Sequence, residues 1–294
     1  MPPEPDRGSS RSARGTLVAA LATYVFAFVL LIAGDTALVY GAAHVLARGR
    51  ADQVDTLASE FARSVPGMLC VGLVSSAILG LTALISARVQ GRRIAGRLRL
   101  TRSRATISGT AATVAGTVGL GLSSGSLADL LGVGRTGSMN TIAGVLAHAT
   151  LPQVGGAVLT IAILPALAEE TLFRGLIQGL FVARLGRWPG IVVSAACFGL
   201  IHLDIVQGTL AAVVGLFLGW TAERLGGIRP AMLAHAVNNG LFILTSIVPD
   251  ADCSSPRILW VLAATGAAAW GASVMLLRLP VAVAKNVPDL SGRA

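Results

Sequence analysis

Long runs of apolar residues recur along this chain, and short stretches between them hold most of its charge. One run, from Val65 to Ala87, contains no charged residue. A helix needs about 20 apolar residues to cross the hydrocarbon core of a bilayer. Only 13% of the residues are charged and the mean hydropathy is +0.74, whereas soluble domains carry roughly 25% charged residues. The sequence therefore predicts an all-α protein that crosses the membrane several times.

Eight spans are predicted from these runs. They cover approximately residues 16–46, 65–87, 107–122, 152–182, 189–202, 206–221, 230–248 and 258–279. The fourth run is about 46 Å long at 1.5 Å per residue, so its last turns should emerge into the cytosol. The third is rich in Gly, Ala and Thr, small residues that let membrane helices approach closely. Asp35 interrupts the first run and is expected near the outer end of its helix, where it can reach water.

Arginine supplies almost all of the net charge of +9, since Lys285 is the single lysine. Clusters of arginine flank the spans at 7–14, 88–104, 184–187 and 224–229. Such clusters are often found in nucleic-acid-binding proteins, but here each adjoins an apolar run, so the positive-inside rule explains them better. We therefore expect no nucleic-acid partner and a plasma-membrane protein with both termini in the cytosol. The excess of arginine over lysine, with abundant Ala and Gly, is typical of a GC-rich bacterial genome.

The remaining composition indicates one membrane domain without a soluble module. Cys70, Cys197 and Cys253 are isolated, so neither a disulfide framework nor a thiolate metal site is predicted. The polar start of the chain is expected to be a cytosolic tail before an uncleaved first helix. We divide the chain into a tail, N-terminal helices with a basic loop, a core, and a last helix with its tail, at 1–15, 16–140, 141–250 and 251–294.

Two adjacent carboxylates and a guanidinium, Glu169, Glu170 and Arg174, lie within the fourth apolar run. A charge at bilayer depth costs about 2.5–3.5 kcal/mol on insertion scales, so such residues usually line a polar interior and pair. Glu170 and Arg174 are four residues apart with the acid first, the favourable order for a helical ion pair. Their pairing leaves Glu169, about 100° away around the helix, free for another role. A surface salt bridge near a helix end is the simpler alternative.

Other polar residues lie in apolar surroundings on the following helices. They are His202, His235 and Asn239, the last one turn beyond His235 and on the same face. A single histidine in a helix is usually a packing residue, but burying all of these groups unpaired would be expensive. We therefore expect them to meet the Glu-Glu-Arg cluster in one hydrated chamber. Pro165 lies four residues before Glu169, and a proline there frees a backbone carbonyl and bends the helix, which would help to open this chamber.

These side chains can perform hydrolysis in two ways. In the first, Glu169 and His202 hold and deprotonate a water, while His235 and Asn239 donate hydrogen bonds to the oxyanion of a tetrahedral intermediate. In the second, His202, His235 and Glu169 bind zinc. No His-Glu-x-x-His motif supports a zinc site, and using Glu169 as a ligand would remove the only evident base. We favour the metal-free site and expect no cofactor.

Three motifs carry a resemblance to a known family. Glu169-Glu170-x-x-x-Arg174, Phe198-x-x-x-His202 and His235-x-x-x-Asn239, in this order on successive membrane helices, resemble the CPBP family. This family comprises CAAX prenyl proteases of the Rce1 type and bacterial Abi, or bacteriocin-immunity-type, proteins, and its members are often labelled metalloproteases. The motifs cover about residues 150–245, and the first 140 residues show none.

The resemblance implies a CPBP-type helix bundle with intramembrane peptidase activity, that is, a hydrolase. It implies Glu169 as the base, Glu170 held by Arg174, His202 assisting the water, and His235 with Asn239 at the oxyanion. It also implies a substrate that is a membrane-associated peptide or protein, cleaved in a chamber open towards the cytosol. A prenylated CAAX substrate is not expected in a bacterium, because bacteria generally lack protein prenylation.

Two other classes of function stay open at this point. A non-catalytic membrane scaffold or bacteriocin self-immunity protein would use the same polar chamber to bind a partner. A small transporter would use the intramembrane charges, but no repeat or pair of broken helices supports it.

Overall fold

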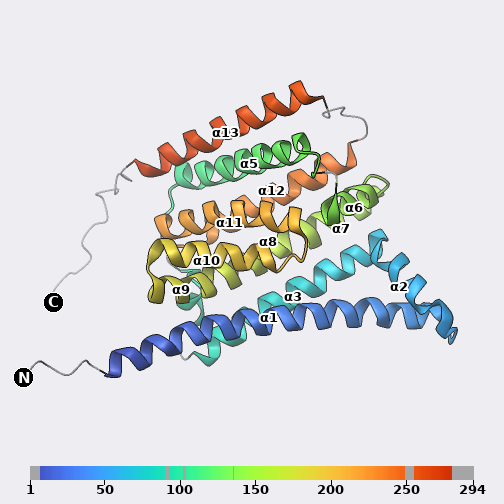
Figure 1. Ribbon diagram of the computed structural model, residues 1–294, viewed down its shortest axis with the longest axis horizontal. Coiled ribbons are helices and arrows are strands. Elements are labelled where there is room, and N and C mark those ends of the chain that lie inside the picture. Colours follow the sequence, from blue (N-terminus) through green and yellow to red (C-terminus); the bar gives the residue numbers. More distant parts are fainter. Residues whose placement is uncertain (1–6, 91–92, 102–103, 135, 249–254, 280–294) are drawn as a thin grey trace, which may run out of the picture.

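The computed structural model describes residues 7–90, 93–101, 104–134, 136–248 and 255–279. Throughout these residues the regular structure is helical and no strand occurs. The longer helices lie side by side and form one bundle (Figure 1). Among the described residues, six helices are long and apolar enough to cross a bilayer. The predicted all-α membrane fold is therefore confirmed.

The elements have the following bounds: α1 (Arg7–Ala47), η1 (Ala51–Gln53), α2 (Val54–Ala62), α3 (Val65–Val89), α4 (Ile94–Arg97), α5 (Ile107–Leu130), α6 (Gly137–Leu146), α7 (Leu151–Ala157), η2 (Val158–Ile163), α8 (Leu164–Glu170), η3 (Thr171–Ile177), α9 (Gln178–Leu185), α10 (Arg187–Leu200), α11 (Ile205–Leu225), α12 (Arg229–Ile247) and α13 (Pro256–Arg278).

Two of the eight predicted spans are helices outside this group of six. The run at 189–202 is α10, which is apolar but has only 14 residues, about 21 Å at 1.5 Å per residue. The run at 230–248 is α12, which has 19 residues but carries His235, Asn238 and Asn239, and these polar residues lower its hydropathy. The count of eight spans therefore stays a prediction.

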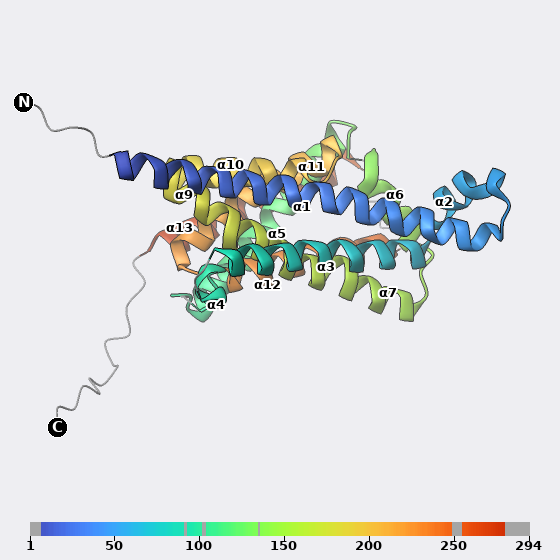
Figure 2. The ribbon, with the colours of Figure 1, turned by 90° about the horizontal axis from the view of Figure 1, so that it is seen from below.

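Helices α1 and α3 form one side of the bundle and lie along each other in both views (Figures 1 and 2). Asp35 of α1 accepts from the Ser75 hydroxyl of α3, which lies 2.9 Å from each carboxylate oxygen. The sequence suggested that Asp35 would reach water, whereas the structure bonds it to a neighbouring helix. The connection between α1 and α3 contains η1 and α2.

On the side of the bundle opposite α1, α5 and α13 pack along each other (Figure 1). A methyl group placed on Gly119 would lie 2.6 Å from the carbonyl oxygen of Gly266, and one placed on Gly266 would lie 2.4 Å from that of Gly119. The two backbones therefore touch, as predicted for a run of small residues. Helix α5 continues to Leu130, eight residues beyond the predicted end of the third span at residue 122.

The central helix runs continuously from Leu151 to Leu185 but contains two segments with a different backbone hydrogen-bond pattern. Its segments η2 and η3 are π-helical, and they flank the α-helical segment α8. Such π segments inside α-helices are rare and frequently lie at functional sites. The one before α8 lies just ahead of Pro165, which cannot donate a backbone hydrogen bond. The pair Glu169-Glu170 ends α8, so it lies between the two π segments.

A glycine turn reverses the chain after the central helix. Gly186 has φ +86°, a left-handed conformation that favours glycine. A methyl group on Gly190 would lie 2.5 Å from the backbone nitrogen of Val182, so α10 can return in close contact with α9. This contact brings Phe198, near the end of α10, back beside the central helix.

The carboxylate of Asp204 joins the N-terminal ends of α6 and α11. Asp204 precedes α11 and accepts from the backbone N–H of Gln207 at 2.8 Å, as an N-cap residue. Its other oxygen accepts from the backbone N–H of Ser138 in the first turn of α6, also at 2.8 Å. The start of α11 and the start of α6 are therefore fixed against each other.

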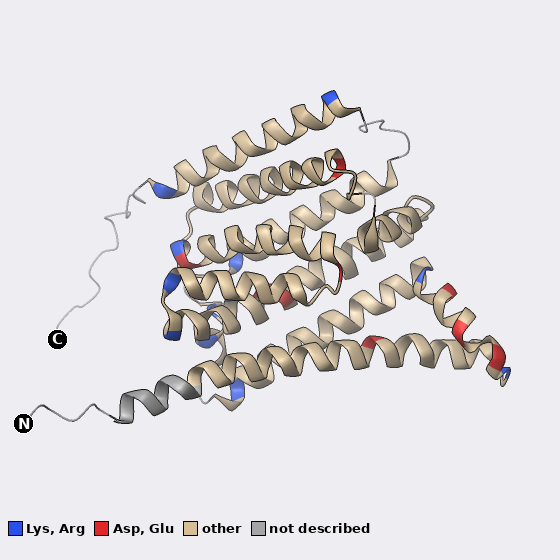
Figure 3. Ribbon diagram, viewed as in Figure 1, with Lys and Arg blue, Asp and Glu red and all other residues tan. Residues whose placement is uncertain are grey.

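The largest buried apolar cluster surrounds the central helix and includes Leu79 of α3, Phe173 and Phe181 of the central helix, and Phe198 of α10. Figure 3 shows acidic residues in the middle of the bundle and arginines gathered at the end where α9 meets α10 and α11 ends. Cys253 and Lys285 lie outside the described residues.

Candidate active site

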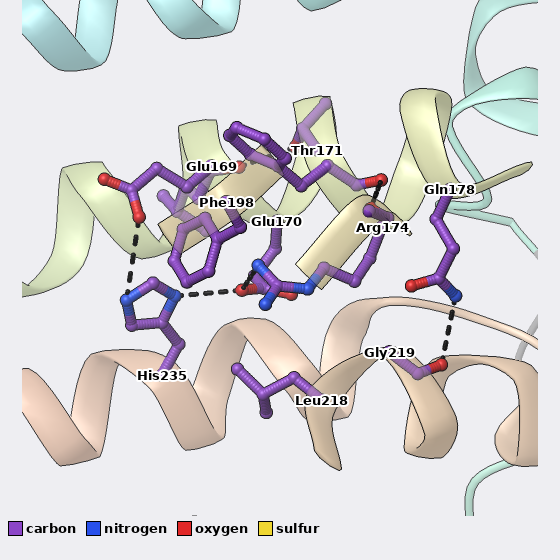
Figure 4. A network of polar contacts seen from close by, with 12 residues as sticks. Glu169, Glu170, Thr171, Arg174, Gln178, Phe198, Leu218, Gly219 and His235 are labelled. Carbon is purple, nitrogen blue, oxygen red and sulfur yellow. Dashed lines mark hydrogen bonds and ion pairs between the residues drawn. The ribbon is translucent and has the colours of Figure 1, made fainter. Parts of the chain in front are cut away.

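The predicted ion pair within the central helix is present and buried. An Nη atom of Arg174 donates to Oε1 of Glu170 at 2.8 Å, with the Arg174 side chain 1% exposed and that of Glu170 0% exposed (Figure 4). Breaking such a pair by removing one partner leaves an uncompensated buried charge and is strongly destabilising. The simpler interpretation as a surface salt bridge is therefore wrong.

Glu170 has a second partner that its position in the sequence did not reveal. Nδ1 of His235, on α12, lies 2.9 Å from the same Oε1 atom. A carboxylate only accepts, so Nδ1 carries the proton and donates it, and Nε2 is left to act on other groups. A buried carboxylate thus orients the imidazole ring and selects its tautomer.

The free side of the His235 ring faces Glu169. Nε2 of His235 and Oε2 of Glu169 are 3.8 Å apart, and the side chains are 8% and 15% exposed. This distance is too long for a direct hydrogen bond, but a water molecule beside the line joining the two atoms can bond to both. Because Arg174 binds Glu170, the Glu169 carboxylate remains available, as the helical spacing predicted.

The ring of Phe198 contacts three polar side chains of the site. The guanidinium carbon of Arg174 lies 4.1 Å from the ring centroid, a cation–π distance. The rings of His202 and His235 stand nearly perpendicular to it, with centroids 5.1 and 5.9 Å away. The sequence motif contained Phe198, but sequence reasoning gave it no role, although its position four residues before His202 was a usable signal.

His202 lies just beyond the end of α10, where its ring contacts that of Phe198 rather than the acidic pair. Its Nδ1 lies 2.8 Å from the carbonyl oxygen of Phe198, so Nδ1 donates and Nε2 carries the lone pair. No hydrogen bond or ion pair joins His202 to Glu169 in the described part of the chain. The next residue, Leu203, has φ +53°, a conformation that is rare for a non-glycine residue and that clusters at functional sites.

Asn239 bonds to the carbonyl group that Pro165 leaves without a helical donor. Residue 165 would normally donate to the carbonyl four residues earlier, which is that of Ile161, but proline has no N–H. Nδ2 of Asn239 lies 3.2 Å from this oxygen and donates to it. An amide carries two N–H groups, so one remains for a substrate. Sequence reasoning identified the freed carbonyl and the polar Asn239 separately, but not their contact.

One comparison with known proteins gives a match. Residues 152–241 match the family model of Rce1-like type II CAAX prenyl endopeptidases. Over these residues the chain is similar to the Rce1-like family. The matched segment contains every predicted site residue, from Glu169 to Asn239, and the resemblance found in the motifs is confirmed. No curated protein and no solved structure gives a match.

The matched segment also contains a buried side-chain amide that sequence reasoning missed. Gln178 is 1% exposed and lies one turn beyond Arg174 and two beyond Glu170, on the same face of the helix. Its Nε2 donates to the carbonyl oxygen of Gly219 at 3.0 Å (Figure 4). The same atom donates to Oε1 of Glu223 at 2.9 Å. A polar side chain at four-residue spacing from a buried ion pair was the available signal.

The Rce1-like site does not present a ready set of metal ligands. Among the described residues, no group of three or more His, Cys, Asp or Glu side chains is arranged to hold a metal ion. In the alternative set, His202 and His235 are bonded through Nδ1 to different acceptors, the Phe198 carbonyl oxygen and Glu170. A catalytic zinc site normally needs three protein ligands, and His202, His235 and Glu169 do not form such a group in this structure.

Proposed function

We propose that this chain is an intramembrane endopeptidase that hydrolyses peptide bonds of membrane-associated proteins or peptides with a water activated by Glu169. The observation that carries the proposal is the 3.8 Å approach of Glu169 Oε2 to Nε2 of a histidine whose other nitrogen is bound to Glu170. The match of residues 152–241 to the model of Rce1-like type II CAAX prenyl endopeptidases supports the same class of reaction.

Glu169 is the general base. It removes a proton from a water that also bonds to an imidazole nitrogen, and general-base help of this kind contributes typically 10²–10⁴-fold. Glu170 is unsuited to this role, because its side chain is 0% exposed and its Oε1 already accepts from Arg174 and His235. His202 can assist, since its Nε2 carries a lone pair that accepts a hydrogen bond from the same water.

The tetrahedral intermediate needs donors for its oxyanion. The hydroxide formed from water attacks the peptide carbonyl carbon, and the carbonyl oxygen takes the negative charge. The remaining N–H of Asn239 and, when the ring is doubly protonated, the Nε2–H of His235 donate to this oxygen. Glu169 then passes its proton to the leaving amine, which completes the hydrolysis and restores the base.

We propose a metal-free site, because the donor set suits proton transfer better than zinc binding and Asn239 is a poor zinc ligand. The arginines gathered at one end of the bundle (Figure 3) favour a plasma membrane protein of a bacterium with both termini in the cytosol. The substrate is then a peptide or the tail of a membrane protein.

Comparison of cellular peptides and membrane proteins tests this function. Cells that carry the wild-type protein, Glu169→Gln, or Glu60→Gln are compared, the last because Glu60 is an exposed glutamate of α2. We expect an uncut substrate to accumulate with Glu169→Gln alone. If Glu169→Gln and wild type give the same cut products, the endopeptidase proposal fails. If Glu169→Gln instead preserves a protective phenotype with no cleavage in either strain, the scaffold or immunity function is the correct one.

A further inference from the structure

A cleft of about 630 Å³ opens at the end of the bundle where the arginines gather. Its charged lining consists of Arg99, Arg104, Arg224 and Glu223, and we call it the basic cleft. Three arginines against one glutamate leave an excess of positive charge. The proposed active site uses none of these side chains, so the basic cleft is a separate feature of the protein.

The charges in the basic cleft are not equally available. Arg99 pairs with Glu223 at 2.5 Å, so these two charges compensate each other. Nε of Arg224 donates to the carbonyl oxygen of Leu277 at 2.9 Å, and one Nη atom donates to the carbonyl oxygens of Arg278 and Leu279 at 3.3 and 3.2 Å. These neutral acceptors leave the positive charge and the other Nη atom available. The Arg104 guanidinium makes no hydrogen bond or ion pair in the described part of the chain. Arg104 and Arg224 therefore offer uncompensated charge to a ligand.

The walls of the basic cleft are held in place by hydrogen bonds. Arg99 has φ +59°, an uncommon conformation for a non-glycine residue that persists only where the surroundings fix it. Its guanidinium also donates to the carbonyl oxygen of Ala222 at 2.9 Å. The backbone N–H of Arg104 donates to the carbonyl oxygen of Leu225 at 2.6 Å. The segment that carries Arg99 and Arg104 is thus tied to the last turn of α11.

The level of the basic cleft in the bundle indicates what occupies it. Two helices that can cross a bilayer end beside it, α11 at Leu225 and α13 at Arg278. The ends of membrane helices lie at the level of the lipid headgroups. Arginine presents a planar fork of donors that suits phosphate, and basic pockets between membrane helices bind anionic headgroups.

We propose that the basic cleft binds the phosphate of an anionic phospholipid, with the Arg104 and Arg224 guanidiniums as its donors. The Arg99–Glu223 pair forms the wall and sets the shape of the cleft. A soluble phosphate has the same chemistry, but the bilayer holds headgroups at this level at high local concentration. The proposal does not depend on the peptidase function, because neither arginine belongs to the proposed active site.

Lipid retention by the full-length protein in nanodiscs tests this proposal. The wild-type protein, Arg104→Gln and Arg184→Gln are placed in phosphatidylcholine with increasing phosphatidylglycerol, and bound lipid is counted by native mass spectrometry. Arg184 is an exposed arginine of α9 outside the basic cleft, so its replacement removes the same charge. We expect retained phosphatidylglycerol with wild type and Arg184→Gln, and about fivefold weaker binding with Arg104→Gln, the effect of one arginine near a headgroup.

Each other outcome overturns the assignment. Equal weakening by both variants means diffuse attraction to an anionic surface and no specific site. The Tm of the wild-type protein in pure phosphatidylcholine is also measured with inorganic phosphate. If phosphate raises this Tm as much as phosphatidylglycerol does, the cleft binds a soluble anion. In pure phosphatidylcholine, the Tm of Arg104→Gln should equal that of wild type. The reason is that the Arg104 side chain is exposed and makes no hydrogen bond or ion pair in the described part of the chain.

Discussion

Glu170 Oε1 accepts from Arg174 at 2.8 Å and from Nδ1 of His235 at 2.9 Å, so one buried oxygen joins the central helix to α12. Glu169, the next residue, faces the other nitrogen of the same imidazole. Two adjacent carboxylates therefore have different tasks. Glu170 holds the ring in place, and Glu169 is left for chemistry.

The first prediction separates these tasks. Glu170→Ala and Arg174→Ala should each lower the free energy of unfolding by about 3–5 kcal/mol, because either leaves a buried charge without its partner. Glu169→Gln should keep the Tm of the purified protein near that of wild type and abolish peptide cleavage. Thermal unfolding in detergent and a cleavage assay measure the two effects. Turnover by Glu169→Gln at the wild-type rate would contradict its assignment as the base.

The second prediction concerns the two bonds that Asn239 can make. Asn239→Ala should lower turnover by about 10²–10³, the usual effect of losing an oxyanion donor. It should also destabilise the protein by about 1–3 kcal/mol, because the Ile161 carbonyl loses its partner. Unfolding and steady-state kinetics measure both changes.

A double variant distinguishes the two bonds of Asn239. Pro165→Ala restores a backbone N–H that can donate to Ile161, so Asn239→Ala with Pro165→Ala should regain stability but remain slow. Coupling between the two positions is expected, since they share one acceptor. Recovery of turnover along with stability would show that Asn239 acts only through the helix backbone.

The third prediction concerns Phe198, which contacts Arg174 and both histidines. Phe198→Leu removes the aromatic face from the guanidinium, an interaction worth about 0.5–2 kcal/mol. It also lets the imidazoles shift, and a displacement of about 1 Å can cost roughly 10²-fold in rate. The control is Phe181→Leu, a phenylalanine in the same cluster that is 1% exposed. Similar losses of kcat in the two variants would mean that Phe198 only fills space.

The fourth prediction is a pH dependence at the junction of α6 and α11. Backbone N–H groups of Gln207 and Ser138 hold the pKa of Asp204 below its usual range. Because the folded pKa is lowered, the stabilisation is present above the unfolded value of about 3.9 and is lost as the pH falls through the folded pKa.

Two variants of Asp204 test this dependence. Asp204→Ala should cost about 1 kcal/mol at pH 7, the usual effect of losing an N-cap. Asp204→Asn keeps an oxygen acceptor but no charge, so its stability should fall less than that of wild type between pH 6 and pH 3. Tm is measured for each protein across this pH range. Parallel curves of Tm against pH for wild type and Asp204→Asn would show that ionisation of Asp204 does not stabilise the fold.

The fifth prediction is the topology. The arginine clusters place residues 88–104 and 184–187 in the cytosol. Reporter fusions at Arg97 and Arg187 should therefore report an inside location, and fusions at Gly49 and Gly134 an outside one. An outside signal at Arg97 would overturn the predicted orientation.

Contacts within one helix were the part of the site that the sequence determined. The Glu170–Arg174 pair follows from four-residue spacing alone, since residues one turn apart share a face of any helix. The same reasoning left Glu169 free and put His235 and Asn239 on one face of α12. Apolar run length likewise predicted most of the membrane-crossing helices, because a bilayer demands a minimum length of uncharged helix.

Contacts between helices were decided only by the tertiary structure. Sequence reasoning placed His202 beside Glu169, but packing places His235 there and leaves His202 against the Phe198 carbonyl. It also predicted that Pro165 frees a backbone carbonyl, without finding that Asn239 on another helix bonds to such a carbonyl. The rotation and depth of each helix depend on how whole surfaces pack. Spacing along the chain determines which residues share a face, but not which face of another helix lies opposite.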